Sequence, residues 1–150
     1  MNYTLITGAS AGIGEVFAKQ LAQQGHNLIL TARRKEKLDA LAKELSNAYK
    51  IKVETLTADL SHPEGVSQIE QGITQAGWQI NGLINNAGFG DRGEFITLPL
   101  DRQLKMIQLN VTTLVELTYR LLPNIKQTKD AFIINVASTA AFQAGPKMAV

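Results

Sequence analysis

The sequence contains no cysteine, which excludes disulfides, thiolate metal sites and a cysteine nucleophile. Its two histidines, His26 and His62, lie far apart and lack the spacing of zinc ligands, so we expect no metal site. No apolar run approaches the roughly 20 residues that a membrane-spanning helix needs, and the first residues lack the basic region of a signal peptide. These absences predict a cytoplasmic protein without a membrane partner.

A large excess of one charge is also lacking. The 150 residues include 15 Lys and Arg and 13 Asp and Glu, which gives a net charge of +2. The longest basic block, residues 33–35, is too short to indicate a nucleic-acid partner. The length suits one domain with a proper hydrophobic core, so we expect residues 1–150 to form a single domain.

Short apolar segments alternate with segments of helical periodicity along the whole chain. The apolar segments are typical of strands buried on both faces, and they span residues 3–7, 27–31, 52–57, 82–85 and 132–136. Strands separated by helices imply right-handed crossovers and a parallel sheet covered on both faces. The predicted fold class is therefore α/β, a doubly wound parallel sheet in strand order 3-2-1-4-5 within a single layered αβα domain.

Punctuating residues predict where the helices begin and end. Gly25 follows the first helical segment, where a glycine relieves the left-handed turn. Residues 61–64 fit a capping box that opens the third helix, and Pro123 is expected to end the longest one. The apolar faces of the first and the longest helical segments consist of Ile13, Val16, Phe17 and Leu21, and of Leu104, Ile107, Val111, Leu114 and Leu121.

The first predicted strand runs straight into a glycine-rich turn, Thr7-Gly-Ala-Ser-Ala-Gly-Ile-Gly, at which a helix begins. Gly8 lets the chain turn off the strand, Gly12 lets backbone approach a phosphate without a Cβ in the way, and Gly14 lets the helix pack closely. The free N–H groups and the dipole of the helix N-terminus then favour a pyrophosphate. No Gly-Lys-Ser/Thr follows, which argues against ATP or GTP hydrolysis. The alternative is a glycine-rich turn without a ligand.

The spacing Gly-x-x-x-Gly-Ile-Gly resembles the cofactor motif of the short-chain dehydrogenase/reductase family. Four further motifs of that family follow in order, namely Asp59-Leu60, Asn85-Asn86-Ala87-Gly88, Asn110 and Ser138. The resemblance implies that residues 1–150 form an NAD(P)-binding, Rossmann-like domain. It implies catalytic roles for Ser138 and Asn110 and cofactor binding by Gly8, Ser10, Ala11, Gly12, Ile13, Gly14, Arg33, Arg34, Asp59, Leu60, Asn86, Ala87 and Gly88.

Arg33 and Arg34 follow the second predicted strand, the place where a dinucleotide enzyme contacts the adenosine ribose. An acidic side chain there binds the 2′-hydroxyl of NAD, but from Thr31 onward this chain has no Asp or Glu until Glu36. Two guanidinium groups suit a phosphate dianion. We therefore predict NADP as the cofactor in preference to NAD, and the alternative is a solvated arginine pair at the start of a surface helix.

The resemblance also implies hydride transfer between the nicotinamide and a carbonyl or alcohol substrate. Ser138 would bind the substrate oxygen, and Asn110 would keep a water in the proton relay. The family's catalytic tyrosine, with a lysine four positions later, is missing, since its usual spacing from Ser138 falls at or just past Val150. We expect the N-terminal part of an NADP-dependent oxidoreductase, C-terminally incomplete and inactive by itself.

Several alternatives stay open at this stage. A non-catalytic NADP-binding module would explain the missing tyrosine and lysine. Ser138 would then be a turn or helix-cap residue, the commoner role of a serine that closes a buried strand. A methyltransferase on a similar sheet would leave Arg33, Arg34 and residues 85–88 unexplained.

The expected partners are a small-molecule carbonyl or alcohol and a second copy of the chain. The homo-oligomer is expected because the long helix over residues 104–121 resembles the dimer-forming helix of the family. An apolar stripe that simply belongs to the core is the alternative.

Overall fold

A computed structural model describes all residues from Met1 to Val150. Five parallel strands form one sheet in the order β3-β2-β1-β4-β5. They are β1 (Asn2–Thr7), β2 (Asn27–Ala32), β3 (Val53–Thr57), β4 (Gln79–Asn85) and β5 (Phe132–Asn135). The predicted fold class and strand order are confirmed, and the predicted strand limits differ from the observed ones by three residues or fewer.

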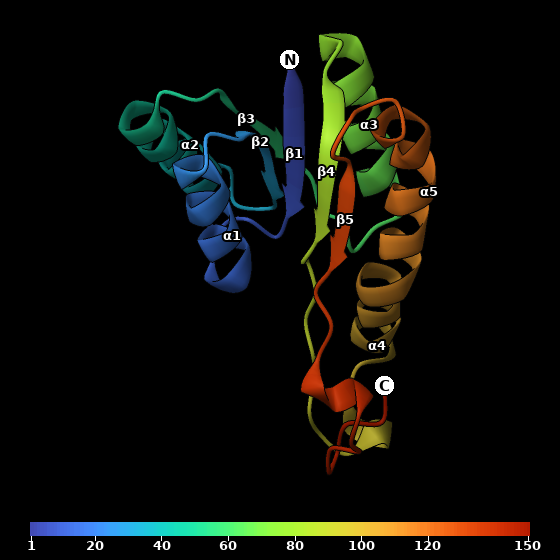
Figure 1. Cartoon of the computed structure of the whole chain (residues 1–150). Coiled ribbons are helices and arrows are strands. Elements are labelled where there is room, and N and C mark those ends of the chain that lie inside the picture. The colour runs from blue at the N-terminus through green and yellow to red at the C-terminus, as the bar shows by residue number, and fades with distance from the viewer.

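Helices cover both faces of this sheet, so the domain has three layers. Figure 1 shows α1 and α2 on one side of the strands and α3, α4 and α5 on the other. The helices are α1 (Gly12–Gln23), α2 (Lys35–Tyr49), α3 (Glu64–Ala76), α4 (Leu100–Ile107) and α5 (Leu114–Ile125). A π-helical turn, η2 (Gln108–Thr113), joins α4 to α5, and two short 3₁₀ turns are η1 (Phe95–Thr97) and η3 (Thr139–Ala141). None of the helices combines the length and the apolar character that crossing a membrane requires.

The hydrophobic core consists of two clusters, one on each face of the sheet. Because successive side chains of a strand point to opposite faces, Leu5 joins the cluster with the α3 and α5 residues. Its neighbour Ile6 joins the cluster with the α1 and α2 residues, and both side chains are fully buried. Burial on both faces explains why the strands are apolar throughout instead of alternating with polar residues.

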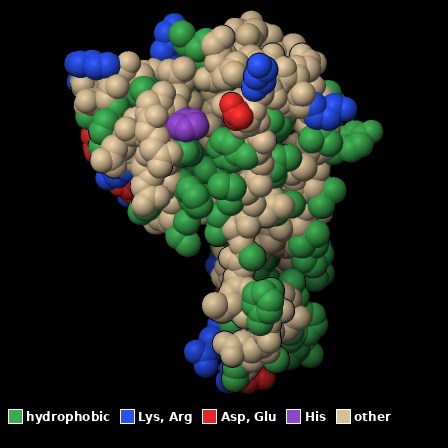
Figure 2. Space-filling view, in the orientation of Figure 1, with side chains coloured by type: hydrophobic (Ala, Val, Ile, Leu, Met, Phe, Trp, Pro, Cys, Tyr) green, Lys and Arg blue, Asp and Glu red, His purple; other side chains and the backbone are tan.

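The segments beyond the carboxyl ends of the strands extend away from this core. In Figure 1 the loop after β4, the η3 turn and the C-terminus lie together below the sheet. Figure 2 shows that they form a narrower projection on which hydrophobic side chains are exposed. Among the residues of these segments, Phe95 and Phe142 are 59% and 88% exposed. The backbone N–H of Gly93 donates to the carbonyl of Lys147 over 2.9 Å, which joins the loop to the C-terminal segment.

The inner face of α1 differs from the predicted one. Gly14, Ala18 and Ala22 are the buried positions, whereas the side chains of Ile13 and Val16 are 60% and 52% exposed. The helix lies so close to the sheet that only small side chains fit beneath it. Phe17 and Leu21 of the predicted face are partly buried and pack against the core. The apolar periodicity therefore indicated the helix correctly and its buried face only in part.

Two of the three predicted helix boundaries are wrong. Gly25 adopts a φ of 84° at the end of α1, as expected. The capping box is absent, because α3 begins at Glu64 after Pro63 and the Ser61 hydroxyl bonds Asp59 instead. Pro123 lies inside α5, which continues to Ile125.

The helix continues past Pro123 because Asn124 fixes its end to the start of β4. The backbone N–H of Ile80 donates to Asn124 Oδ1 over 2.8 Å, and Gln79 Nε2 donates to the same oxygen over 2.6 Å. Asn124 Nδ2 in turn donates to the carbonyl of Trp78 over 3.3 Å. These tertiary contacts override the helix-breaking tendency of the proline.

The apolar stripe predicted along the long helix is mostly exposed. Its residues Leu104, Ile107 and Val111 are between 43% and 57% exposed, whereas Leu117 and Leu121 belong to the core. The exposed apolar side chains of α4, η2 and α5, which we call the outer stripe, are Leu100, Leu104, Ile107, Val111, Val115, Tyr119 and Leu122.

Candidate functional site

A cavity of about 730 Å³ lies beyond the carboxyl ends of the strands, where the strand order reverses between β1 and β4. Open α/β sheets bind ligands at this switch point. The cavity brings together residues that follow β1, β2, β3, β4 and β5. Of the site residues predicted from the sequence, all but Gly12 and Gly14 line it.

The glycine turn is closely packed on one side and open on the other. Gly8 has a φ of 68°, and a Cβ there would lie 2.9 Å from Asn86 Nδ2. A Cβ on Gly14 would lie 2.5 Å from that same nitrogen and from the Gly8 carbonyl oxygen. Gly12, with a φ of 60°, has no atom within 4 Å of where its Cβ would be. The backbone at Gly12 therefore borders open space, which fits the close approach of a pyrophosphate.

Thr7 and Asn86 hold this turn against the end of β4. Thr7 Oγ1 donates to the Ile84 carbonyl over 3.2 Å and accepts the backbone N–H groups of Asn86 and Ala87, each over 2.9 Å. Asn86 Nδ2 donates to the Thr7 carbonyl over 2.9 Å. Thr7 was not among the predicted site residues, although a polar residue at the end of a buried strand indicates a hydrogen-bonding role.

Asn85 has a structural role on the other side of β4. Its side chain is buried, and its Nδ2 donates to Thr118 Oγ1 over 3.0 Å and to Asn135 Oδ1 over 2.9 Å. These contacts tie β4 to α5 and to β5. The two neighbouring asparagines therefore join the end of β4 to different elements, Asn86 to the end of β1 and Asn85 to α5 and β5.

Two exposed arginines border the cavity beside the glycine turn. Arg34 Nη2 donates to Ser10 Oγ over 3.0 Å and lies 3.5 Å from the Ser10 carbonyl oxygen. Neither Arg33 nor Arg34 forms an ion pair with a carboxylate, although the chain contains eight ion pairs between Lys or Arg and Asp or Glu elsewhere. Two guanidinium groups at a cavity, neither in direct contact with a carboxylate, favour an anionic ligand such as a phosphate.

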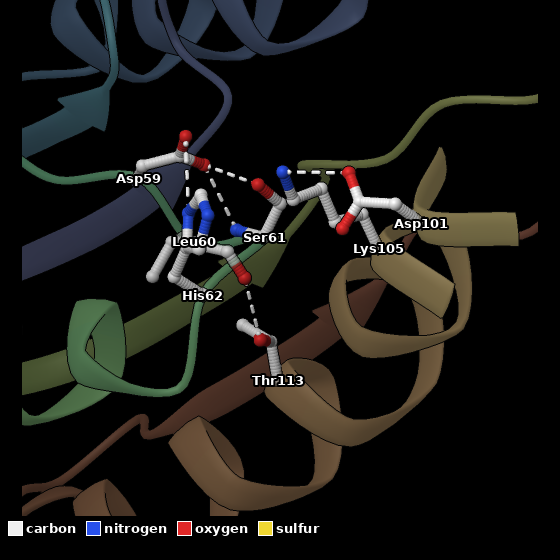
Figure 3. A network of polar contacts seen from close by, with 7 residues as sticks. All are labelled: Asp59, Leu60, Ser61, His62, Asp101, Lys105 and Thr113. Carbon is white, nitrogen blue, oxygen red and sulfur yellow. Dashed lines mark hydrogen bonds and ion pairs between the residues drawn. The ribbon is translucent and has the colours of Figure 1, made fainter. Parts of the chain in front are cut away.

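Asp59 lies at the same end of the cavity, in the network drawn in Figure 3. Its Oδ1 accepts the backbone N–H of Ser61 over 3.0 Å and the Ser61 hydroxyl over 2.6 Å, while His62 Nδ1 lies 3.4 Å from Oδ2. Burial alone would raise the pKa of this carboxyl group. The hydrogen bonds from Ser61 and the nearby Arg33 and His62 outweigh burial and lower the pKa, so Asp59 is an ionised acceptor at neutral pH.

The loop after β4 is fixed by Asn110, which lies in the π turn η2. Asn110 Oδ1 accepts the backbone N–H of Phe89 over 3.1 Å, and its Nδ2 donates to the carbonyl of Phe89 over 2.9 Å. A Cβ on Gly88 would lie 3.1 Å from Asn110 Oδ1. The side chain of Asn110 thus acts as a clamp on this loop, and π turns often occur at functional sites.

Asp91 forms a second clamp on the loop, which no sequence motif predicted. Asp91 Oδ2 lies 2.7 Å from Arg102 Nε and 3.2 Å from Gln103 Nε2, and the Arg102 guanidinium lies 5.1 Å from the centre of the Phe89 ring. The hydrogen bond from Arg102 is the largest cause of a lowered pKa at Asp91. Nothing in the one-dimensional spacing of these residues indicated that they meet.

Ser138 follows β5 and lines the cavity. Its Oγ accepts the backbone N–H of Ala140 over 3.1 Å and caps the η3 turn, while its own hydroxyl hydrogen has no acceptor in the protein. The hydroxyl group is therefore free to donate to a ligand in the cavity. None of the three tyrosines lines the cavity.

Comparisons with known proteins agree with this geometry. The family model described as short chain dehydrogenase matches residues 2–150. Very-long-chain 3-oxoacyl-CoA reductase-A of Danio rerio is 31% identical, and the match covers 99% of this chain and 47% of that protein. The chain thus spans about half the length of the curated relatives it matches.

Two solved structures are similar over nearly the whole chain. A short-chain dehydrogenase from Sphingobium yanoikuyae in complex with NADPH has a TM-score of 0.89 and 36% identity, over 99% of this chain and 57% of that one. L-sorbose reductase from Gluconobacter frateurii, complexed with NADPH and L-sorbose, has a TM-score of 0.91 and 27% identity, over 98% of this chain and 56% of that one. Because the family model, the glycine turn and the cavity at the switch point coincide, this chain belongs to the short-chain dehydrogenase/reductase family of oxidoreductases.

Proposed function

We propose that this chain binds NADP for an oxidoreductase that interconverts a carbonyl and an alcohol. The observation that carries the proposal is the pair of arginines beside the glycine turn, which line the cavity and have no carboxylate within ion-pair distance. Similarity to proteins whose titles name NADPH supports the same cofactor. Two of the relatives named above are, by name, a very-long-chain 3-oxoacyl-CoA reductase and an L-sorbose reductase, which supports a carbonyl substrate without fixing its size.

Each part of the cavity would have a separate task. The glycine turn with Ser10, Ala11 and Ile13 would hold the pyrophosphate, Arg33 and Arg34 the 2′-phosphate, and Asp59 and Leu60 the adenine. Asn86, Ala87 and Gly88 would hold the nicotinamide half. When bound, the cofactor supplies or accepts a hydride. Ser138 would donate its free hydroxyl hydrogen to the substrate oxygen, and Asn110 would keep its loop in place.

The experiment compares the affinities for NADPH and NADH in variants that lack the positive charges of Arg33 and Arg34. Replacing Arg33 and Arg34 with alanine should weaken NADPH at least tenfold, because two charge-assisted contacts to a dianion are lost, and should change NADH by less than threefold. Lys43→Ala, in an exposed position of α2, is the control and should change neither affinity. Equal losses for both cofactors would contradict the NADP assignment, and no binding of either by the unmodified chain would overturn the function.

A non-catalytic NADP-binding module is the second candidate. Two observations favour it. No tyrosine lines the cavity, and residues 1–150 contain no Tyr-x-x-x-Lys. We propose that these 150 residues bind NADPH without oxidising it. Incubation with NADPH and a ketone should leave the nicotinamide absorbance unchanged, whereas steady loss of that absorbance would show that another group serves as the acid.

We also propose that the outer stripe pairs two copies of the chain. Seven large apolar side chains on one helical face exceed what an isolated exposed helix usually carries. Val111→Lys combined with Val115→Lys should shift the mass in solution to that of a monomer. A single mass for both proteins would contradict this interface. The cytoplasmic location remains a prediction from the sequence.

A further inference from the structure

The π turn η2 contacts the loops at both ends of the cavity, and one of these contacts has no role in the function proposed above. Thr113 Oγ1 donates to the backbone carbonyl of Leu60 over 2.7 Å, as drawn in Figure 3. Both residues are buried, at 3% and 4% exposure. Leu60 directly follows Asp59 and lines the cavity.

The geometry of η2 explains how one turn reaches two loops. Asn110 and Thr113 are three residues apart, so in a regular α-helix their side chains would lie close to the same face. A π turn advances fewer degrees per residue, because its hydrogen bonds span five residues instead of four. The two side chains therefore diverge, with Asn110 bonded to Phe89 and Thr113 bonded to Leu60.

The Leu60 carbonyl depends on Thr113. No backbone N–H donates to it, so the threonine supplies its hydrogen bond within the protein. The rest of the loop is held from other directions, since Asp59 accepts two bonds from Ser61 and a Cβ on Gly65 would collide with the Asp59 carbonyl oxygen. A buried carbonyl that lost its donor would either remain unsatisfied or move toward solvent.

We infer that Thr113 is a positioning residue for the adenosine half of the cofactor. Its hydroxyl keeps Leu60 buried, and the Asp59 carboxylate next to it is thereby held at the cavity before the ligand arrives. A ligand that meets an ordered loop loses less affinity to the ordering of that loop. The inference rests on the proposed NADP function and adds a residue that does not itself line the cavity.

The test measures the affinity of the whole chain for each half of the cofactor separately. Thr113→Val removes the hydroxyl at nearly constant volume and should weaken 2′,5′-ADP roughly fivefold, the change expected for one lost hydrogen bond. Reduced nicotinamide mononucleotide should bind unchanged. Thr113→Ser, which keeps the hydroxyl, should restore the affinity for 2′,5′-ADP to within about twofold.

Thr128→Val is the control for the loss of a threonine hydroxyl. Thr128 lies just after the C-terminal end of α5, and its Oγ1 also donates to a backbone carbonyl, that of Ile125, over 2.9 Å. It should leave 2′,5′-ADP binding unchanged. Hydrogen exchange provides a readout without ligand. The amides of residues 58–62 should exchange faster in Thr113→Val than in Thr128→Val.

Two results would overturn the inference. One is that Thr113→Val weakens both half-ligands equally and lowers the melting temperature as Thr128→Val does, which would show a general loss of stability. The other is that it changes neither exchange at residues 58–62 nor 2′,5′-ADP binding. If the unmodified chain binds no 2′,5′-ADP, the proposed function and the role of Thr113 in binding both fail. Faster exchange would still show that Thr113 orders the loop.

Discussion

Thr7 and Asn86 bond each other in both directions, since the Thr7 hydroxyl accepts the Asn86 backbone N–H and the Asn86 side chain donates to the Thr7 carbonyl, each over 2.9 Å. The pair joins the glycine turn to the loop after β4 at the point where the strand order reverses. Thr7 is 2% exposed, so water does not replace these contacts.

Thr7→Val should therefore destabilise the domain. The substitution leaves the backbone N–H groups of Asn86 and Ala87 without their acceptor, and we expect the free energy of unfolding to fall by about 2 kcal/mol. Thr7→Ser, which keeps the hydroxyl, should lose less than half of that. Urea denaturation measures both values, and equal stability of the valine variant and the unmodified chain would contradict the role of the hydroxyl.

Thr31 presents the opposite case on the neighbouring strand, where it pairs with Thr7 in the register of β1 and β2. Its hydroxyl is buried and is the one buried side-chain polar atom that has no hydrogen-bond partner. Thr31→Val should leave stability unchanged or raise it by about 1 kcal/mol, because an unsatisfied polar group is replaced by a methyl group. A loss of more than about 1 kcal/mol in the same denaturation assay would show that the hydroxyl has a partner.

Gly12 and Gly25 allow a matched comparison of two positive-φ glycines. They have φ values of 60° and 84°, and no atom lies within 4 Å of either missing Cβ. Substitution by alanine should destabilise the chain by a similar amount at both positions, on the order of 1 kcal/mol. Only Gly12→Ala should also weaken NADPH, because Gly12 lies between Ala11 and Ile13, which line the cavity, whereas Gly25 lies at the other end of α1. A parallel loss of NADPH affinity in Gly25→Ala would point to strain instead of contact.

Asp91 should make stability depend on pH. Its pKa is lowered in the folded protein, chiefly by the hydrogen bond from Arg102, so the unfolded chain binds the proton more tightly. The stabilisation is present above the unfolded-state pKa of about 3.9 and is lost as the pH falls through the lower folded-state value. Asp91→Asn should lower the melting temperature at pH 7, and the difference from the unmodified chain should shrink below pH 4. A constant difference across this range would exclude the charge as its cause.

The fold could be predicted because its signals are local and repeated. Five apolar segments separated by helical periodicity leave few arrangements for a parallel sheet, and the observed strand order is the expected one. The glycine turn was found because the conformation of Gly8 and Gly12 restricts the residue type.

Features that depend on distant partners could not be predicted in this way. Pro123 was expected to end a helix, but Asn124 bonds residues 79 and 80, which are more than forty positions earlier in the chain. Asp91 and Arg102 carry no motif, and their meeting follows from the path of the loop after β4. The π turn changes the direction in which successive side chains point around the helix, and the apolar periodicity of only six residues does not reveal that change.

The clamps on the cavity loops have a consequence for the speed of binding. Asn86, Asn110 and Thr113 hold their loops through hydrogen bonds made entirely between groups of the protein. Little rearrangement is then left for the ligand to induce, so diffusional encounter should limit association. The observed rate constant for binding should therefore rise linearly with ligand concentration, without a plateau. If Arg33 and Arg34 bind the 2′-phosphate as proposed, the residence time of the ligand should then distinguish NADPH from NADH.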